Sequence, residues 1–161
     1  MVMVDSSHPD QFARWLAVLD PQRPTEASDV AAYRQGLTSL ANPLTNAEHF
    51  DIPRSAAQVR ATATLGTIPL VVLTAGREMD PAALRVPLEA AWRGMREEMA
   101  GLSTDSVHVL MPTSGHYIQI ESPKAVIAAI QQVVTAVRTQ GRLPACTTTF
   151  PALGGACFPA L

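Results

Sequence analysis

His116 is the residue whose type and position offer the clearest chemistry. It lies in a Ser-Gly-His-Tyr segment directly after residues 107–112, an apolar run that predicts a strand. Ligands of open α/β sheets bind beyond the carboxyl ends of the strands, so a loop histidine is well placed there. Because an imidazole titrates near neutral pH, it can move a proton between a hydroxyl nucleophile and a leaving group. We therefore take His116 as the candidate general base.

The other histidines and the two cysteines predict no metal site. His8 precedes a proline in a predicted turn, and neither His49 nor His108 has a partner at helical spacing. Cys146 and Cys157 lie close to the end of the chain, with no metal-ligand spacing around them, so we expect two free thiols. There is no glycine-rich phosphate loop, and we expect no cofactor.

The elements that must position His116 alternate between strands and helices. Largely apolar runs predict strands at residues 1–4, 68–74 and 107–112, and the second is a near-continuous β-branched and aliphatic run, as in a parallel strand buried on both faces. Three- and four-residue spacing predicts helices at residues 10–19, 25–40, 53–64, 80–99 and 123–139, with Thr25 and Asp80 as N-caps. This order predicts an α/β fold with a sheet of about three parallel strands.

Composition narrows the class of protein. The chain has 161 residues, of which 47% are hydrophobic, which suits one globular domain. A net charge of -2 provides no basic stripe for a phosphate backbone, so we expect no nucleic-acid partner. No apolar run is long enough for a membrane span. The first residues lack the features of a signal peptide, and we expect a cytoplasmic protein.

Three segments resemble the last three strand-and-loop units of the α/β-hydrolase superfamily. They are residues 1–11, 68–76 and 107–126. The third is the most specific, because Ser-Gly-His is followed by apolar residues, an acidic residue, a proline and an apolar helix, as in that superfamily's catalytic-histidine loop. The resemblance implies a partial hydrolase domain over residues 1–140, with flanking helices and a cap-like helical insertion at residues 10–65. The segment 141–161, rich in Gly, Pro and Thr, is expected to be a disordered tail.

The resemblance also implies an acid that orients the imidazole, and it leaves the position of this acid open. Asp5 ends the first strand, where some lipase-like members of the superfamily carry their acid. Glu78 and Asp80 follow the second strand, which is the commoner location. We favour Asp5, because Asp80 also suits a helix N-cap and Glu78 can be a solvated surface residue.

The nucleophile that the superfamily uses is missing from this sequence. Complete members carry a serine on a Gly-x-Ser-x-Gly elbow and cleave esters and related bonds through an acyl-enzyme. Ser6 and Ser7 follow a strand but lack the flanking glycines of an elbow, and Ser114 belongs to the histidine loop itself. We therefore expect little or no hydrolase activity from this chain alone, and a small ester-like substrate only where the site is complete.

Two other interpretations remain open at the level of sequence. One is a non-enzymatic binding module, which uses exposed apolar surface and strand edges to self-associate or to bind a complementing N-terminal fragment. The other is a truncated gene product with no function of its own.

Overall fold

The computed structural model describes residues 1–19, 21–42, 50–62, 64–77 and 81–158, and it has an α/β fold. The described chain divides into two compact units. We call Met1–Ser6, Thr64–Arg77 and Arg96–Leu161 the sheet unit, and Ser7–Ala63 with Glu78–Met95 the helical unit. The predicted helical insertion at residues 10–65 falls almost wholly in the helical unit, and its role as a cap stays a prediction.

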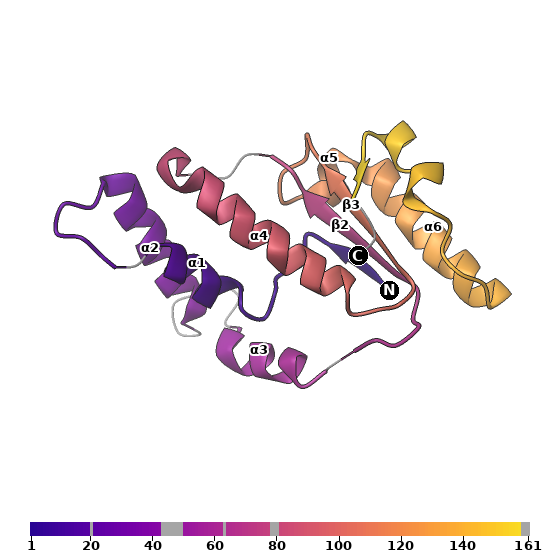
Figure 1. The fold of residues 1–161 in the computed structure, drawn as a ribbon, viewed down its shortest axis with the longest axis horizontal. Coiled ribbons are helices and arrows are strands. Elements are labelled where there is room, and N and C mark those ends of the chain that lie inside the picture. The colour runs from indigo at the N-terminus through magenta and orange to yellow at the C-terminus, as the bar shows by residue number, and fades with distance from the viewer. Residues whose placement is uncertain (20, 43–49, 63, 78–80, 159–161) are drawn as a thin grey trace. The chain divides into compact units, whose positions relative to one another are not determined.

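The sheet has the order β1-β2-β3-β4 (Figure 1). Its first three strands are parallel, as the sequence predicts: β1 (Val2–Val4), β2 (Leu70–Ala75) and β3 (Ser106–Met111). The short strand β4 (Ala156–Cys157) was not predicted, and it pairs antiparallel with β3. Because all three parallel strands run the same way, the residues that follow β1 and β3 lie at one edge of the sheet.

Both faces of the parallel sheet are covered by apolar side chains. The helix α6 (Pro123–Thr139) packs on one face through Ala125 and Ala129, which lie in the same buried cluster as Leu73 and Val109 (Figure 1). The opposite face carries a smaller buried cluster of Leu70, Val72 and Ala100, the last residue of α4 (Arg85–Ala100). This burial explains why β2 is apolar at consecutive positions from Leu70 to Leu73 rather than at alternate ones.

The C-terminal segment corrects two predictions, because residues 141–158 are ordered and the thiols are not free. Cys146 and Cys157 form a disulfide, which closes a loop containing η2 (Cys146–Thr148) and η3 (Pro151–Leu153). Phe150, within this loop, is fully buried in the main core. The local sequence has no period, so its structure comes from contacts with the rest of the sheet unit, among them the burial of Phe150 and the pairing with β3, together with the cross-link.

The helical unit is organised around three helices that follow the predicted spacing. They are α1 (Gln11–Leu19), α2 (Ser28–Ala41) and α3 (Ile52–Arg60), and the short η1 (Ala82–Leu84) precedes α4. Leu19, Val30 and Leu37 form its buried core. Trp15 of α1 stacks on Trp92 of α4, with 5.1 Å between ring centroids.

The predicted N-cap at Thr25 is wrong. Ala27 precedes α2 and offers no side-chain cap. The chain before α2 is instead held by Glu26, whose carboxylate accepts a hydrogen bond from Arg34 at 2.8 Å. This ion pair fixes the residues around Thr25 outside the helix, which a cap rule based on local sequence does not anticipate. The second predicted N-cap, Asp80, lies outside the described residues.

Candidate functional site: an acid and a histidine at the carboxyl edge of the sheet

Asp5 follows β1 in an unusual backbone conformation. Its φ is +42°, in the left-handed region that few residues other than glycine adopt, although Asp tolerates it better than most. The Asp5 N–H still donates to the Leu73 carbonyl at 2.8 Å, so the pairing with β2 extends to this residue. Only 3% of Asp5 is exposed. Strained residues of this kind cluster at functional sites, which makes the position informative.

The two carboxylate oxygens of Asp5 have different partners. Oδ1 accepts the Ala75 N–H at 3.0 Å and lies 3.7 Å from Nη2 of Arg96. Oδ2 lies 2.8 Å from Nδ1 of His116. An ionised carboxylate only accepts hydrogen bonds, so this contact requires the hydrogen on Nδ1. In neutral His116 the ring nitrogen Nε2 then carries a lone pair and can accept a proton.

The loop that carries His116 is anchored to the end of β2. The Ser114 carbonyl accepts the N–H groups of Gly76 and Arg77 at 3.1 and 3.0 Å, and Arg77 also forms an ion pair with Glu121 of α5 (Ile118–Glu121). A Cβ at Gly76 would lie 2.7 Å from the Pro112 backbone, so only glycine permits this close approach. The loop therefore holds its position through backbone contacts while the His116 side chain remains 66% exposed.

A group of buried polar side chains lies on the same side of the sheet as Asp5 and consists of Arg96, Thr74 and His108. His108 Nε2 lies 2.8 Å from the Thr74 hydroxyl. Burial, together with the smaller effect of the positive charge of Arg96, lowers the pKa of His108 to about 4. Burial also lowers the pKa of Arg96 to about 10, an effect that the charge of Asp5 opposes. His108 is consequently neutral at physiological pH, whereas Arg96 is charged.

The structure brings together two of the four residues that the sequence nominated. His116 and Asp5, which are 111 positions apart in the chain, are in hydrogen-bond contact. The alternative acids Glu78 and Asp80 lie outside the described residues. Tyr117 makes an edge contact with the His116 ring at 5.2 Å between centroids. The geometry matches the arrangement in which an acid orients a histidine by its Nδ1.

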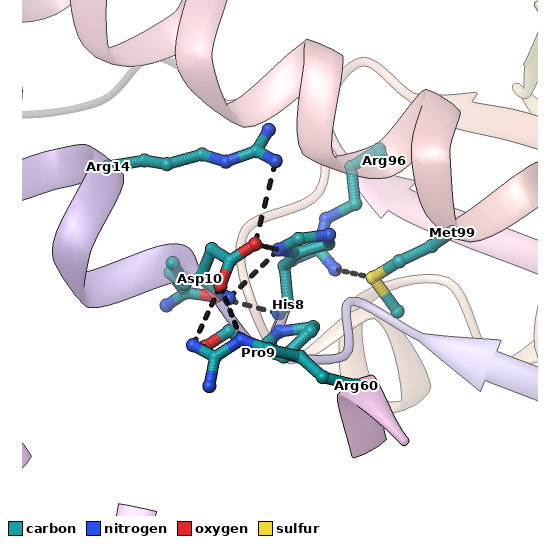
Figure 2. A network of polar contacts seen from close by, with 8 residues as sticks. His8, Pro9, Asp10, Arg14, Arg60, Arg96 and Met99 are labelled. Atoms are coloured by element: carbon teal, nitrogen blue, oxygen red, sulfur yellow. Dashed lines mark hydrogen bonds and ion pairs between the residues drawn. The ribbon is translucent and has the colours of Figure 1, made fainter. Parts of the chain in front are cut away.

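His8 has a structural partner, as its position before a proline indicates. Its Nδ1 accepts the Asp10 N–H at 3.0 Å. Figure 2 shows the Asp10 carboxylate between Arg14 and Arg60, and Arg60 donates to it at 2.7 Å. The hydrogen bond from Arg60 is the main reason that the pKa of Asp10 is lowered. This cluster joins the start of α1 to the end of α3 within the helical unit.

Arg96 is the residue of the site that the sequence interpretation missed. It is fully buried, and Figure 2 shows its guanidinium beside Met99, with 3.3 Å between Nη1 and the sulfur. The sequence did contain a signal for it. Arg96 lies four residues after Trp92 and three before Met99, so helical spacing puts it on the same face as these two apolar residues. A charged residue on an apolar stripe calls for a buried partner.

The described residues provide no partner hydroxyl or thiol for His116 Nε2. Ser114 is buried, and its hydroxyl contacts that of Ser122 at 2.8 Å. A cavity of about 660 Å³ lies elsewhere in the sheet unit, at the amino end of β3, and its walls include His108 and Phe158. None of the residues that line this cavity belongs to the Asp5 and His116 pair.

Comparisons with known proteins do not identify a relative of this chain: no family model, no curated protein and no solved structure matches it. Among the described residues, no group of three or more His, Cys, Asp or Glu side chains is arranged to hold a metal ion. In the same part of the chain, none of the helices has the length and apolar character needed to cross a membrane.

Proposed function

We propose that this chain is an α/β-hydrolase-like protein in which Asp5 orients His116 as a general base for the cleavage of an ester or related bond. The observation that carries the proposal is the 2.8 Å contact between His116 Nδ1 and Asp5 Oδ2. It is supported by the parallel sheet, which places both residues at the carboxyl edge where ligands of such sheets bind. The Ser-Gly-His loop and its resemblance to the superfamily are consistent with this role.

The proposed chemistry follows from the different roles of the two ring nitrogens of His116. Asp5 Oδ2 accepts a hydrogen bond from Nδ1–H, which fixes the tautomer and stabilises the imidazolium that forms when Nε2 accepts a proton. The exposed side of His116 is the side on which a hydroxyl nucleophile and a small ester-like substrate would approach. General bases positioned in this way contribute roughly 10²- to 10⁴-fold to a rate.

The proposed site lacks a nucleophile among the described residues. The sequence holds no Gly-x-Ser-x-Gly elbow, and no described hydroxyl contacts His116 Nε2. We propose that a serine from another polypeptide segment completes the site, and that the chain alone is a hydrolase with little or no activity. In a serine hydrolase, loss of the nucleophile alone removes most of the rate enhancement of the triad.

The test has two measurements on the purified chain. Nitrogen-resolved NMR at alkaline pH, where the imidazole is neutral, should find the His116 hydrogen on Nδ1, and Asp5→Asn should remove this preference. Hydrolysis of a short-chain chromogenic ester should stay near background in wild type and in His116→Ala, with no labelling by a serine-directed fluorophosphonate.

Each measurement can overturn a separate part of the proposal. An Nε2–H tautomer in wild type would mean that the acid and histidine do not act as a pair. Clear ester hydrolysis that disappears in His116→Ala, together with fluorophosphonate labelling, would reveal a nucleophile within this chain. His108→Gln is the matched control, because His108 is buried and bonded to Thr74, so neither readout should change.

A further inference from the structure

We infer that Arg96 is a positioning residue, which holds the Asp5 carboxylate so that its Oδ2 remains directed at His116. The inference rests on the proposed function, because it assigns a role within the same pair. It names a residue on a helix 91 positions away from Asp5 in the sequence, and no sequence motif links the two.

The first argument is that the two carboxylate oxygens of Asp5 have different partners. Oδ1 is held by the Ala75 N–H at 3.0 Å and faces Nη2 of Arg96 at 3.7 Å, whereas Oδ2 contacts His116. Two groups on Oδ1 restrict rotation of the carboxylate about its bond to Cβ. Rotation would otherwise exchange the two oxygens or turn both away from His116 Nδ1.

The second argument is electrostatic. The side chains of Asp5 and Arg96 are 4% and 0% exposed, so water contributes little to the solvation of either charge. A buried carboxylate without a cation tends to protonate, and a protonated carboxyl would not need the Nδ1 hydrogen of His116. His116 is largely exposed, so among the described residues Arg96 is the buried cation beside Asp5.

The third argument is the position of Arg96 in its helix. Arg96 lies on the segment of α4 that belongs to the sheet unit, and its Nη1 contacts the sulfur of Met99 one turn later. Burying a guanidinium carries a large desolvation cost before any partner is counted. A residue that served only to fill space here would be better replaced by Met or Leu, so the charge itself calls for an explanation.

The experiment compares Arg96→Met with Arg96→Lys by the NMR assay of the His116 tautomer, which requires neither substrate nor nucleophile. We expect Arg96→Met to lose the preference for Nδ1–H and Arg96→Lys to retain most of it, because lysine keeps the charge. As an internal check, Arg96→Met should also raise the pKa of His108, since it removes the positive charge that helps to lower it. A folded Arg96→Met protein with an unchanged His116 tautomer would overturn the inference.

If Arg96→Met fails to fold, a second variant distinguishes a role of Arg96 in pairing with Asp5 from a role in packing. Removal of one member of a buried pair leaves the other uncompensated, whereas removal of both is often tolerated. If the double variant Asp5→Asn/Arg96→Met folds, the charge of Asp5 was the cause and the pairing stands. If the double variant also unfolds while Asp5→Asn alone folds, Arg96 is a packing residue and the inference fails. An absent Nδ1–H tautomer in wild type would instead count against the proposed function.

Discussion

The two ends of β3 each carry a histidine, in opposite surroundings. His108, near the amino end, is 8% exposed, bonds Thr74 and stacks on Phe158 at 4.3 Å between ring centroids. His116, beyond the carboxyl end, is mostly exposed and contacts Asp5. One imidazole is therefore part of the packing, and the other is available to a ligand. The comparison shows that residue type alone does not mark a site, because the environment decides which histidine can exchange protons.

β3 and the loop that follows it are held in place in different ways. The segment from Cys146 to Phe158 lies against the strand itself, with a disulfide, a buried Phe150 and the pairing of β4 with Val109 and Leu110. Beyond the carboxyl end, the loop is held by hydrogen bonds to backbone groups of β2 and by an exposed ion pair between Arg77 and Glu121. We therefore expect changes in the C-terminal segment to affect stability and changes in the loop to affect chemistry.

The largest expected effect is the loss of the disulfide. Cys146 and Cys157 are 11 positions apart, and closing a loop of this length stabilises the fold by about 3 kcal/mol in the chain-entropy description. Cys146→Ser/Cys157→Ser should lower the free energy of unfolding by about that amount in urea titrations. A reducing agent should reproduce the loss in wild type and change nothing in the variant. Equal stability of both proteins would mean that the C-terminal segment is held against β3 without the cross-link.

This disulfide also bears on the predicted cytoplasmic location. Cytosolic glutathione and thioredoxin keep most thiols reduced, so a structural disulfide is more typical of an oxidising compartment. The cytoplasmic prediction rested on the first few residues, which carry no information about the C-terminal cysteines.

The next effect is a dependence of stability on pH that comes from His108. Its pKa is about 4 in the folded protein and 6.5 in an unfolded chain, so below pH 6.5 the unfolded state binds the proton that the folded state excludes. The contribution of His108 is present above pH 6.5 and is lost as the pH falls towards 4. At 1.4 kcal/mol per pKa unit, with some reduction for solvent screening, the loss is about 2 kcal/mol.

Urea titrations of wild type and His108→Gln between pH 7 and pH 4 measure this contribution directly. The variant should show a shallower fall in the free energy of unfolding, because glutamine does not titrate. Carboxylates contribute equally to both proteins and cancel in the difference. Parallel curves for the two proteins would show that His108 is protonated as easily in the fold as in the unfolded chain.

The smallest expected effect on stability is that of His116→Ala. The ring is mostly exposed, but its removal leaves Oδ2 of the buried Asp5 without its hydrogen bond, so the free energy of unfolding should fall by about 1 kcal/mol. Circular dichroism during thermal unfolding is sufficient to test this, with His108→Ala as the matched comparison at the other end of β3. A loss above about 2 kcal/mol for His116→Ala would mean that His116 is structural, which would remove the contrast between the two histidines.

Periodicity alone was enough to find the main elements of this fold. The β-branched run before Thr74 and the three- and four-residue spacing of α6 predicted a parallel strand and its covering helix, because burial on a sheet selects for those patterns locally. His116 was nominated differently, by its place after a predicted strand and by the resemblance of the Ser-Gly-His segment to a catalytic-histidine loop. Local physics therefore accounts for the α/β class and for the three parallel strands.

Tertiary structure decided which distant residues meet. The sequence left the choice between Asp5, Glu78 and Asp80 open, and it gave no reason to place Arg96 beside Asp5 or to join Cys146 to Cys157. Each of these contacts depends on strand order and helix position, which bring together residues that are far apart in the chain. Periodicity reports only whether a position is buried, whereas the partner of a buried charge is set by the packing of whole elements.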